Sequence, residues 1–269
     1  MPPDLRPETQ AAIEALRAGL AVVQARTGAS DVRLKGPRDI VTGTDLAAQA
    51  AIGAVLGERT PHIAFVGEEG NSRVPESGDY WLVDPLCGTG NFAAGLPMYA
   101  TNVALVEDSE VTIGVVADGT TGEVYVAERG RGAWLSDQRL RVDPNAHIVS
   151  IDPGLPGPGW LRRFGDELCV RVLAEHELRV RILSTTLALE YVARGWLGGA
   201  VYICDGLPVH FAAGLRIAEE AGAIVTDEHG RPWQVAGPIY VVAANRELHA
   251  EICRVVLRSV EMCRYLSGQ

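Results

Sequence analysis

Lysine is almost absent from this 269-residue sequence. Lys35 is its single lysine, so all the other residues counted as Lys or Arg are arginines. Basic residues are also outnumbered, with 24 Lys and Arg against 34 Asp and Glu, which gives a formal net charge of -10. An acidic surface repels phosphate backbones and anionic lipid headgroups, so we expect no nucleic acid and no membrane as a partner. An anionic substrate would have to be held locally, by backbone amides or by metal ions.

Long apolar runs and paired cysteines are missing as well. No stretch is long enough to span a bilayer, and the start, Met1-Pro2-Pro3-Asp4, lacks the basic and then apolar pattern of a signal peptide. The five cysteines are scattered, odd in number and without a CxxC pair. This usage predicts a cytoplasmic protein with reduced thiols rather than a disulfide-linked one.

What is present is a globular composition, with 47% hydrophobic residues, which excludes intrinsic disorder. Strands and tight turns dominate from Thr101 to about Val142, in the pattern of an antiparallel meander. After Asp143, strands alternate with helices. We therefore predict an α/β (α+β) chain with two halves, residues 1–142 and 143–269, joined in one body.

The individual elements follow from the hydrophobic periodicity. Helical spacing predicts helices over 7–26, from a Thr44 cap to about 56, near 160–168, over 185–194, over 210–221 and from 247 onward. Short apolar or alternating runs predict strands at 63–66, 80–83, 102–106, 111–116, 123–127, 148–151, 178–183, 200–204 and 239–243.

Five segments, in order along nearly the whole chain, carry a resemblance to a known family. They are 39–45 (DIVTGTD), 65–69 (FVGEE), 81–92 (WLVDPLCGTGNF), 184–195 (STTLALEYVARG) and 212–222 (AAGLRIAEEAG). Together they resemble the inositol monophosphatase superfamily of metal-dependent sugar phosphatases. The resemblance implies a layered α-β-α-β-α sandwich that is usually a homodimer and acts on a small-molecule substrate.

The resemblance also implies a metal site built from oxygen ligands. In the family, two or three Mg²⁺ ions neutralise the phosphate monoester and supply the attacking water. Carried over to this sequence, the first ion would be held by Glu68, Asp84 and the Leu86 carbonyl.

The same resemblance implies positions for water and phosphate. Asp45 and Thr89 would help position the attacking water. The backbone amides of Gly88 and Thr89, at the start of a helix, would bind the phosphate or another anion.

The second metal position departs from the family pattern. The resemblance implies that Asp84 shares this ion with two further aspartates, but Cys87 stands in the place of one and His210 in the place of the other. Ile203 and Ala188 likewise replace acidic residues that the family associates with substrate hydroxyls. A thiol and an imidazole are poor ligands for Mg²⁺, which prefers oxygen.

From these departures we predict an enzyme that has left Mg²⁺-dependent phosphatase chemistry, requires no cofactor and serves small-molecule biosynthesis. Cys87 and His210 would converge, because they replace two ligands of one ion. The helix after Cys87 would favour a thiolate, and the helix that His210 begins would keep its ring neutral as a base. The phosphate-binding amides would become an oxyanion site. The residues predicted to be catalytic are Cys87, His210, Asp84, Asp45 and Thr89.

Two alternatives stay open. Glu68, Asp84, Cys87 and His210 are a mixed ligand set that suits Zn²⁺ or Fe²⁺, so the first alternative is a Mg²⁺- or Zn²⁺-dependent phosphatase of a small sugar- or inositol-type phosphate monoester. The second is a non-catalytic homologue in which Cys87 and His210 are neutral drift. Against drift, clustered carboxylates are retained although their mutual repulsion costs stability.

Overall fold

The computed structural model of the chain describes residues 4–26, 32–34, 40–70, 73–152, 160–175, 178–204 and 208–267. Within these ranges the strands form a larger sheet, a smaller sheet and one short antiparallel pair. The short pair joins β1 (Arg33–Leu34) to β2 (Ile40–Val41).

The larger sheet contains the predicted meander. Among the described residues its strand order is β3-β4-β5-β6-β7-β8-β9, and all pairings after the parallel β3–β4 pair are antiparallel. The strands are β3 (Ala64–Gly67), β4 (Tyr80–Cys87), β5 (Ala100–Glu107), β6 (Glu110–Asp118), β7 (Val124–Glu128), β8 (Gly132–Leu135) and β9 (Gln138–Arg139). The meander is thus confirmed, and β8 and β9 extend it.

The smaller sheet holds the strands that alternate with helices. Its described order is β11-β10-β12-β14-β13; the two pairings of β10 are parallel and the two pairings of β14 are antiparallel. The strands are β10 (Ile148–Asp152), β11 (Arg179–Arg181), β12 (Gly199–Ile203), β13 (Ile224–Thr226) and β14 (Ile239–Ala243). The short strand β13 ends at the turn 227–230, around which the sequence pattern predicts a hairpin, and Thr226 forms an antiparallel bridge with Pro232 across this turn.

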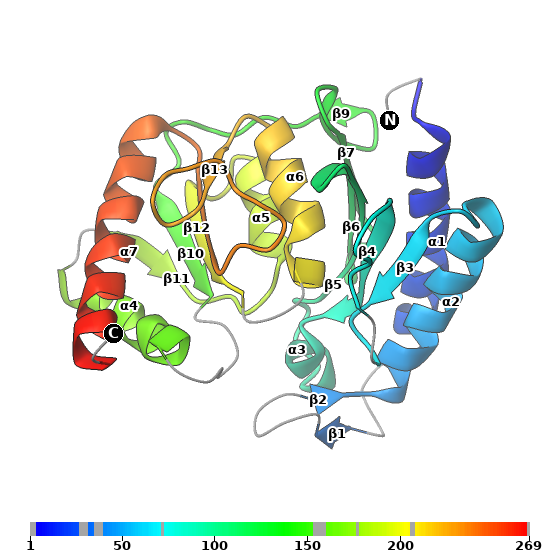
Figure 1. The fold of residues 1–269 in the computed structure, drawn as a ribbon, viewed down its shortest axis with the longest axis horizontal. Helices are drawn as coiled ribbons and strands as arrows, with labels where there is room; N and C mark the ends of the chain where they lie inside the picture. The colour runs from blue at the N-terminus through cyan, green and yellow to red at the C-terminus, as the bar shows by residue number, and fades with distance from the viewer. Residues whose placement is uncertain are drawn as a thin grey trace.

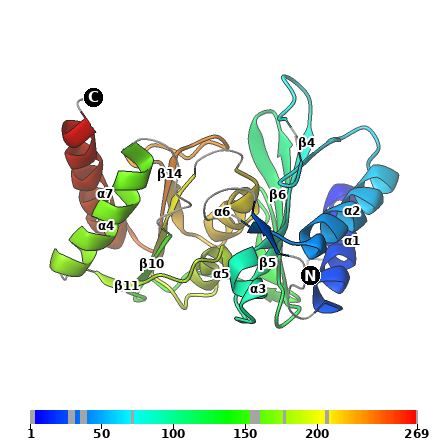
Figure 2. The same cartoon turned by 90° about the horizontal axis from the view of Figure 1, so that it is seen from below.

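Helices lie in three layers around the two sheets (Figures 1 and 2). The first layer, α1 (Pro7–Gln24) and α2 (Gly43–Arg59), covers the outer face of the larger sheet. The middle layer, α5 (Leu187–Ala193) and α6 (Ala212–Glu220), lies between the sheets. The third, α4 (Trp160–Glu175) and α7 (Arg246–Ser267), covers the smaller sheet. The predicted α-β-α-β-α sandwich is confirmed.

The layers explain why β4 is buried along its whole length. Trp81 and Val83 pack toward α1 and α2, while Tyr80 and Leu82 pack toward the middle layer. A strand covered by helices on both faces has a nearly continuous apolar sequence instead of an alternating one. The polar Asp84 at the end of this run is therefore a strong signal of function.

A glycine allows the middle layer to approach the larger sheet closely. A Cβ atom at Gly114, on β6, would lie 2.4 Å from the carbonyl oxygen of Ala213, on α6. Any larger residue at this position would push α6 away from the sheet. The short 3-10 helix η1 (Pro208–His210) directly precedes α6 and contacts both α6 and β4.

The chain passes from the larger to the smaller sheet between Arg139 and Ile148. The middle-layer helices come from the second part of the chain and pack on both sheets. The division into halves 1–142 and 143–269 stays a prediction. In the described part of the chain, none of the helices has both the length and the apolar character that crossing a bilayer requires.

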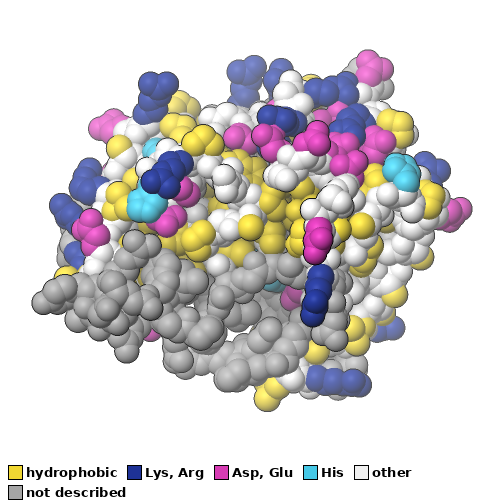
Figure 3. All heavy atoms as spheres, viewed as in Figure 1, with side chains coloured by type: hydrophobic (Ala, Val, Ile, Leu, Met, Phe, Trp, Pro, Cys, Tyr) yellow, Lys and Arg dark blue, Asp and Glu magenta, His cyan; other side chains and the backbone are white. Residues whose placement is uncertain are grey.

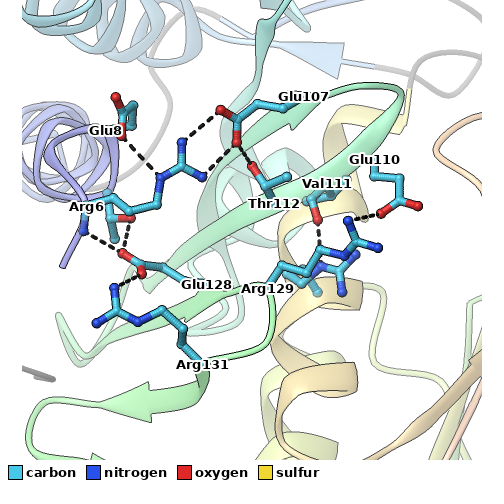
Figure 4. A network of polar contacts seen from close by, with 11 residues as sticks. Arg6, Glu8, Glu107, Glu110, Val111, Thr112, Glu128, Arg129 and Arg131 are labelled. Atoms are coloured by element: carbon cyan, nitrogen blue, oxygen red, sulfur yellow. Dashed lines mark hydrogen bonds and ion pairs between the residues drawn. The ribbon is translucent and has the colours of Figure 1, made fainter. Parts of the chain in front are cut away.

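A polar network anchors the start of α1 to the larger sheet (Figure 4). The Arg6 guanidinium donates two hydrogen bonds to Glu107, of 2.7 and 2.8 Å. Glu128 accepts from the Arg6 amide at 2.8 Å, from the Thr9 hydroxyl at 2.5 Å and from Arg131 at 2.6 Å. On the face drawn in Figure 3, basic and acidic side chains lie intermixed along the upper edge, so the acidic net charge does not form one patch there.

Replacing Glu128 with Ala should lower the free energy of unfolding by about 2 kcal/mol, because the Arg6 amide and the Thr9 hydroxyl lose their buried acceptor. Urea unfolding followed by circular dichroism measures this change. The control is Glu110→Ala: Glu110 pairs with Arg129 at 2.6 Å, but both side chains are about half exposed. Its loss should cost about 0.5 kcal/mol or less. Equal losses in the two variants would contradict the anchoring role of Glu128.

Candidate active site

The site is built at the carboxyl end of β4, where the strand leaves its regular register. Asp84 pairs with Asn102 on β5, but Cys87, three residues later, pairs with Ala100, so β4 carries one extra residue. Residues three apart in a regular strand point to opposite faces. The bulge, at which Pro85 is tolerated, brings Asp84 and Cys87 to the same side of the sheet.

Asp84, Cys87 and His210 converge on this side. One oxygen, sulfur or nitrogen atom from each lies within 4.8 Å of the other two. His210 Nδ1 lies 2.6 Å from Asp84 Oδ2, and Asp84 Oδ1 accepts a hydrogen bond from the Leu86 amide at 3.1 Å. Asp84 is fully buried, whereas the His210 side chain is 31% exposed. The predicted approach of the thiol to the imidazole is correct as geometry.

The protonation state of Cys87 differs from the prediction. Burial, together with the negative charge of Asp84, raises the pKa of the Cys87 thiol to about 11, although His210 and Thr186 act in the opposite direction. The helix after Cys87, α3 (Thr89–Ala93), has only five residues, so its dipole is too small to offset these effects. The expected thiolate is wrong for the protein without a bound ion.

His210 also differs from the prediction. It ends η1 and lies two residues before α6, so it is not the first residue of a long helix. Burial acts to lower the pKa of the imidazole, but the Asp84 carboxylate and the Cys87 side chain raise it well above its ordinary value. The raised pKa favours a protonated ring beside Asp84, which runs against the expected neutral base.

Asp45 is held by the start of α2. Thr42, rather than the expected Thr44, caps this helix. The Asp45 Oδ2 atom accepts from the Thr42 amide at 2.8 Å and from its hydroxyl at 2.5 Å, which is a capping box. Burial raises the pKa of the Asp45 carboxyl, and hydrogen bonds from Thr42 and Thr89 act in the opposite direction.

Thr89 links Asp45 to the end of β4. Its hydroxyl oxygen lies 3.0 Å from Asp45 Oδ1 and 3.0 Å from the Leu86 carbonyl oxygen. Residues that are 44 positions apart in sequence therefore meet through one hydroxyl. The motif residue Asp39 lies outside the described residues.

Glu68 follows β3 and lies beside the end of β4. Its amide donates to the Val83 carbonyl at 2.9 Å, in continuation of the parallel β3–β4 pairing. This pairing places Glu68 next to Asp84 in the sheet. The Glu68 charge also contributes to the raised pKa of His210.

Gly88 makes the turn from β4 into α3. Its φ of 88° is left-handed, and a Cβ atom there would lie 2.8 Å from the Met98 carbonyl oxygen. Only glycine fits this position without strain. The turn places the amides of Gly88 and Thr89 at the start of α3, where a helix has no backbone acceptors for them.

Sequence reasoning missed two residues of the site, Thr186 and Asn102. The Thr186 side chain hydrogen-bonds to Cys87, and it lies 3.4 Å from the Asn102 amide nitrogen. Asn102 is fully buried in β5, directly opposite Asp84. A buried asparagine in an apolar strand was an available signal, because such side chains are retained only with partners.

Comparison with known proteins gives this geometry a context. The model of the inositol monophosphatase family matches residues 4–261. An inositol-1-monophosphatase of Mesorhizobium japonicum is 38% identical over 205 residues, which is 74% of this chain and 76% of that protein.

The chain belongs to the inositol monophosphatase family. A fructose-1,6-bisphosphatase/inositol-1-monophosphatase of Thermotoga maritima is 35% identical over 84% of this chain and 86% of its own length. The solved structure of a Thermotoga maritima IMPase superposes with a TM-score of 0.84 at 29% identity, covering 96% of this chain and all of that one. The resemblance seen in the sequence motifs is confirmed.

Family membership corrects two expectations. Members of this family are Mg²⁺-dependent phosphatases, and both relatives described above, each of which matches about three quarters or more of this chain, are named as phosphatases. The prediction of non-phosphatase chemistry is therefore wrong, and so is the prediction that no cofactor is required. The chain belongs to an enzyme family.

The site has two kinds of ligand atoms: one group consists of oxygen atoms, which suit a hard divalent ion, and the other includes sulfur and nitrogen, which do not. The Glu68 and Asp84 carboxylates and the Leu86 carbonyl are oxygen donors grouped at the ends of β3 and β4, as Mg²⁺ prefers. Cys87 and His210 offer sulfur and nitrogen instead. The residues present thus fit one Mg²⁺ ion, but the second position does not fit that ion.

Proposed function

We propose that this protein is a divalent-metal-dependent phosphatase that hydrolyses a small sugar- or inositol-type phosphate monoester. One observation carries the proposal: the Thr89 hydroxyl lies 3.0 Å from both the Asp45 carboxylate and the Leu86 carbonyl. A proton acceptor and an oxygen ligand thereby meet at one small polar group. That is the arrangement needed to orient a water molecule for attack on phosphorus.

The oxygen ligands would hold the ion. A Mg²⁺ ion bound by Glu68, Asp84 and the Leu86 carbonyl would supply positive charge to the phosphate and acidify a bound water. Asp84 is oriented for this role, because its Oδ1 accepts from the Leu86 amide at 3.1 Å. The Gly88 turn supports phosphate binding, since it presents backbone amides to an anion.

Asp45 and Thr89 would handle the proton of the attacking water. The Thr89 hydroxyl can accept a hydrogen bond from water while it donates to Asp45. Burial raises the pKa of the Asp45 carboxyl, which makes it a better proton acceptor than an exposed aspartate. The new phosphorus–oxygen bond forms as the bond to the alcohol breaks; the attacking water gives a proton to Asp45, and the leaving alkoxide takes up one proton from solvent, which Asp45 later replaces.

Two buried apolar residues bear on the substrate. Ala188 on α5 and Ile203 on β12 occupy positions that the family resemblance associates with acidic contacts to substrate hydroxyls, and both are buried. We infer that the substrate makes fewer hydroxyl contacts there than inositol phosphate does in relatives. The homodimer, the cytoplasmic location and a role in small-molecule biosynthesis stay predictions from the sequence.

The test is phosphate release from a panel of inositol, sugar and other polyol phosphates with Mg²⁺ titrated. Replacing Thr89 with Val should lower kcat by ~10²-fold or more, because the link between water and Asp45 is lost. The matched control is Thr101→Val, since the Thr101 hydroxyl also donates to a carbonyl of the β4 end, that of Pro85 at 3.0 Å. This variant should keep nearly all activity. No metal-dependent phosphate release from any member of the panel would reject the proposed function.

A further inference from the structure

Asp84, Cys87 and His210 bring three different donor atoms together. An oxygen, a sulfur and a nitrogen lie within 4.8 Å of one another. Mg²⁺ binds oxygen ligands, whereas thiolate and imidazole select Zn²⁺ and similar softer ions. The side chains at this position therefore disagree with the ion that the family resemblance implies.

The arrangement suits a tetrahedral ion. Zn²⁺ bonds to oxygen, nitrogen and sulfur put neighbouring ligand atoms roughly 3.3–3.8 Å apart in a tetrahedron. Side-chain shifts of about 1 Å would bring the three donor atoms to that spacing. Three protein ligands also leave a fourth position open, as in zinc sites that bind water or substrate.

Neighbouring groups orient the ligands. The Leu86 amide fixes Asp84 Oδ1 at 3.1 Å, which leaves Oδ2 facing His210 Nδ1 at 2.6 Å. The Thr186 side chain hydrogen-bonds to Cys87 and is itself next to Asn102. Outer hydrogen bonds of this kind hold metal ligands in position.

We propose that Asp84, Cys87 and His210 bind a Zn²⁺-type ion, while the oxygen set at Glu68, Asp84 and Leu86 takes Mg²⁺. One carboxylate and one thiolate balance the two positive charges of this ion. The inference rests on the proposed function, because it names the second ion that would serve the same hydrolysis. It assigns the replacement of two aspartates to a change of metal and not to a loss of chemistry.

The test adds Co²⁺, a spectroscopic substitute for Zn²⁺, to protein that a chelator has freed of metal. We expect one equivalent to bind, with a near-ultraviolet charge-transfer band from a thiolate ligand. Zn²⁺ should displace it, and millimolar Mg²⁺ should not. Cys87→Ser should remove the band and weaken Zn²⁺ binding by about 100-fold or more, since loss of an outer-shell partner alone can cost that much.

The matched control is Cys253→Ser. The Cys253 sulfur lies 3.6 Å from His249 Nε2 on α7, so it forms a second cysteine–histidine pair, but in the described residues no carboxylate oxygen lies within 4.8 Å of both to complete a group of three ligands. This variant should keep the band and the zinc affinity. Thermal melting of each metal-free variant checks that it is folded.

The double variant Cys87→Asp/His210→Asp should reverse the preference, with weaker Zn²⁺ binding and stronger Mg²⁺ binding. The proposal is overturned if wild-type protein shows no thiolate band, if the band survives Cys87→Ser, or if Cys253→Ser removes it. Metal binding is measured without substrate, so the two proposals can fail separately. Zinc binding without turnover would reject the function alone, and turnover with Mg²⁺ in protein that binds no zinc would reject this site alone.

Discussion

Replacing Asp84 with Asn is expected to lower kcat/KM for phosphate monoester hydrolysis by ~10³-fold or more. Asp84 belongs to both proposed ligand sets, so the variant loses a full negative charge from each. Metal-based stabilisation of a transition state is worth several kcal/mol, and every ~1.4 kcal/mol is a factor of ten in rate. Asn keeps the side-chain oxygen that accepts from the Leu86 amide at 3.1 Å, so the loss is not one of local folding.

Steady-state phosphate release at saturating Mg²⁺ measures the effect, and thermal melting verifies the fold. Asp227→Asn is the matched control. Asp227 lies in the turn after β13, where its Oδ1 accepts from the amides of His229 and Arg231 at 2.8 Å, and an Asn can do the same. It should retain wild-type activity. If Asp84→Asn kept a tenth of the activity or more, Asp84 would not be the shared ligand.

Glu190 is expected to make the protein lose stability as the pH rises. It lies on α5 in the middle layer, fully buried, and its carboxylate oxygens have no hydrogen-bond partner among the described residues. Gly214 on α6 makes room for it, because a Cβ atom there would lie 2.9 Å from Glu190 Oε1. Burial, with a smaller contribution from the charge of Asp118, raises the pKa of the Glu190 carboxyl from 4.5 to about 8.

The sign follows from the two protonation states. Between pH 4.5 and about 8, Glu190 is ionised in the unfolded chain but neutral in the folded chain. Ionisation therefore stabilises the unfolded state as the pH rises, and the free energy of unfolding falls. Above that window the loss is complete. Glu190→Gln carries no titrating proton, so it should exceed the wild type by roughly 3 to 5 kcal/mol above pH 8.

Urea unfolding of both proteins at pH 5, 6.5 and 8.5 checks this expectation. At pH 5 the unfolded chain has only begun to gain from ionising Glu190, so the two proteins should differ by less than about 1 kcal/mol, which serves as the internal control. A constant difference between them at all three pH values would show that Glu190 does not titrate as its burial requires.

The fold was accessible from local patterns, for reasons visible in particular elements. The β5–β6–β7 meander has short apolar strands joined by tight turns, and the helices of the outer layers have clear periodicity. The cap of α2 was misplaced by two residues, because Thr42 and Thr44 are equally good capping residues. Thr42 is the N-cap because Asp45, three residues later, completes a capping box with it.

Most of the residues that form the site could be predicted from the sequence, but their pKa shifts could not. The family resemblance placed Cys87 and His210 at one metal position, and the bulge after Asp84 shows how the chain brings Cys87 there. Their pKa shifts could not be read from the sequence, since they depend on burial and on the 2.6 Å approach of His210 to Asp84. Helix dipoles were the wrong guide because α3 is too short and His210 precedes α6.

Polar contacts at the site join the larger sheet to the segments that lead into the middle-layer helices. His210, from the segment leading into α6, touches Asp84 of β4, and Asn91 of α3 donates to the Ser184 carbonyl at 3.0 Å ahead of α5. A ligand bound at this site would contact both the larger sheet and the middle helical layer. A ligand that binds only the folded state stabilises that state. The free energy of unfolding of this protein should therefore rise with the concentration of its ligand.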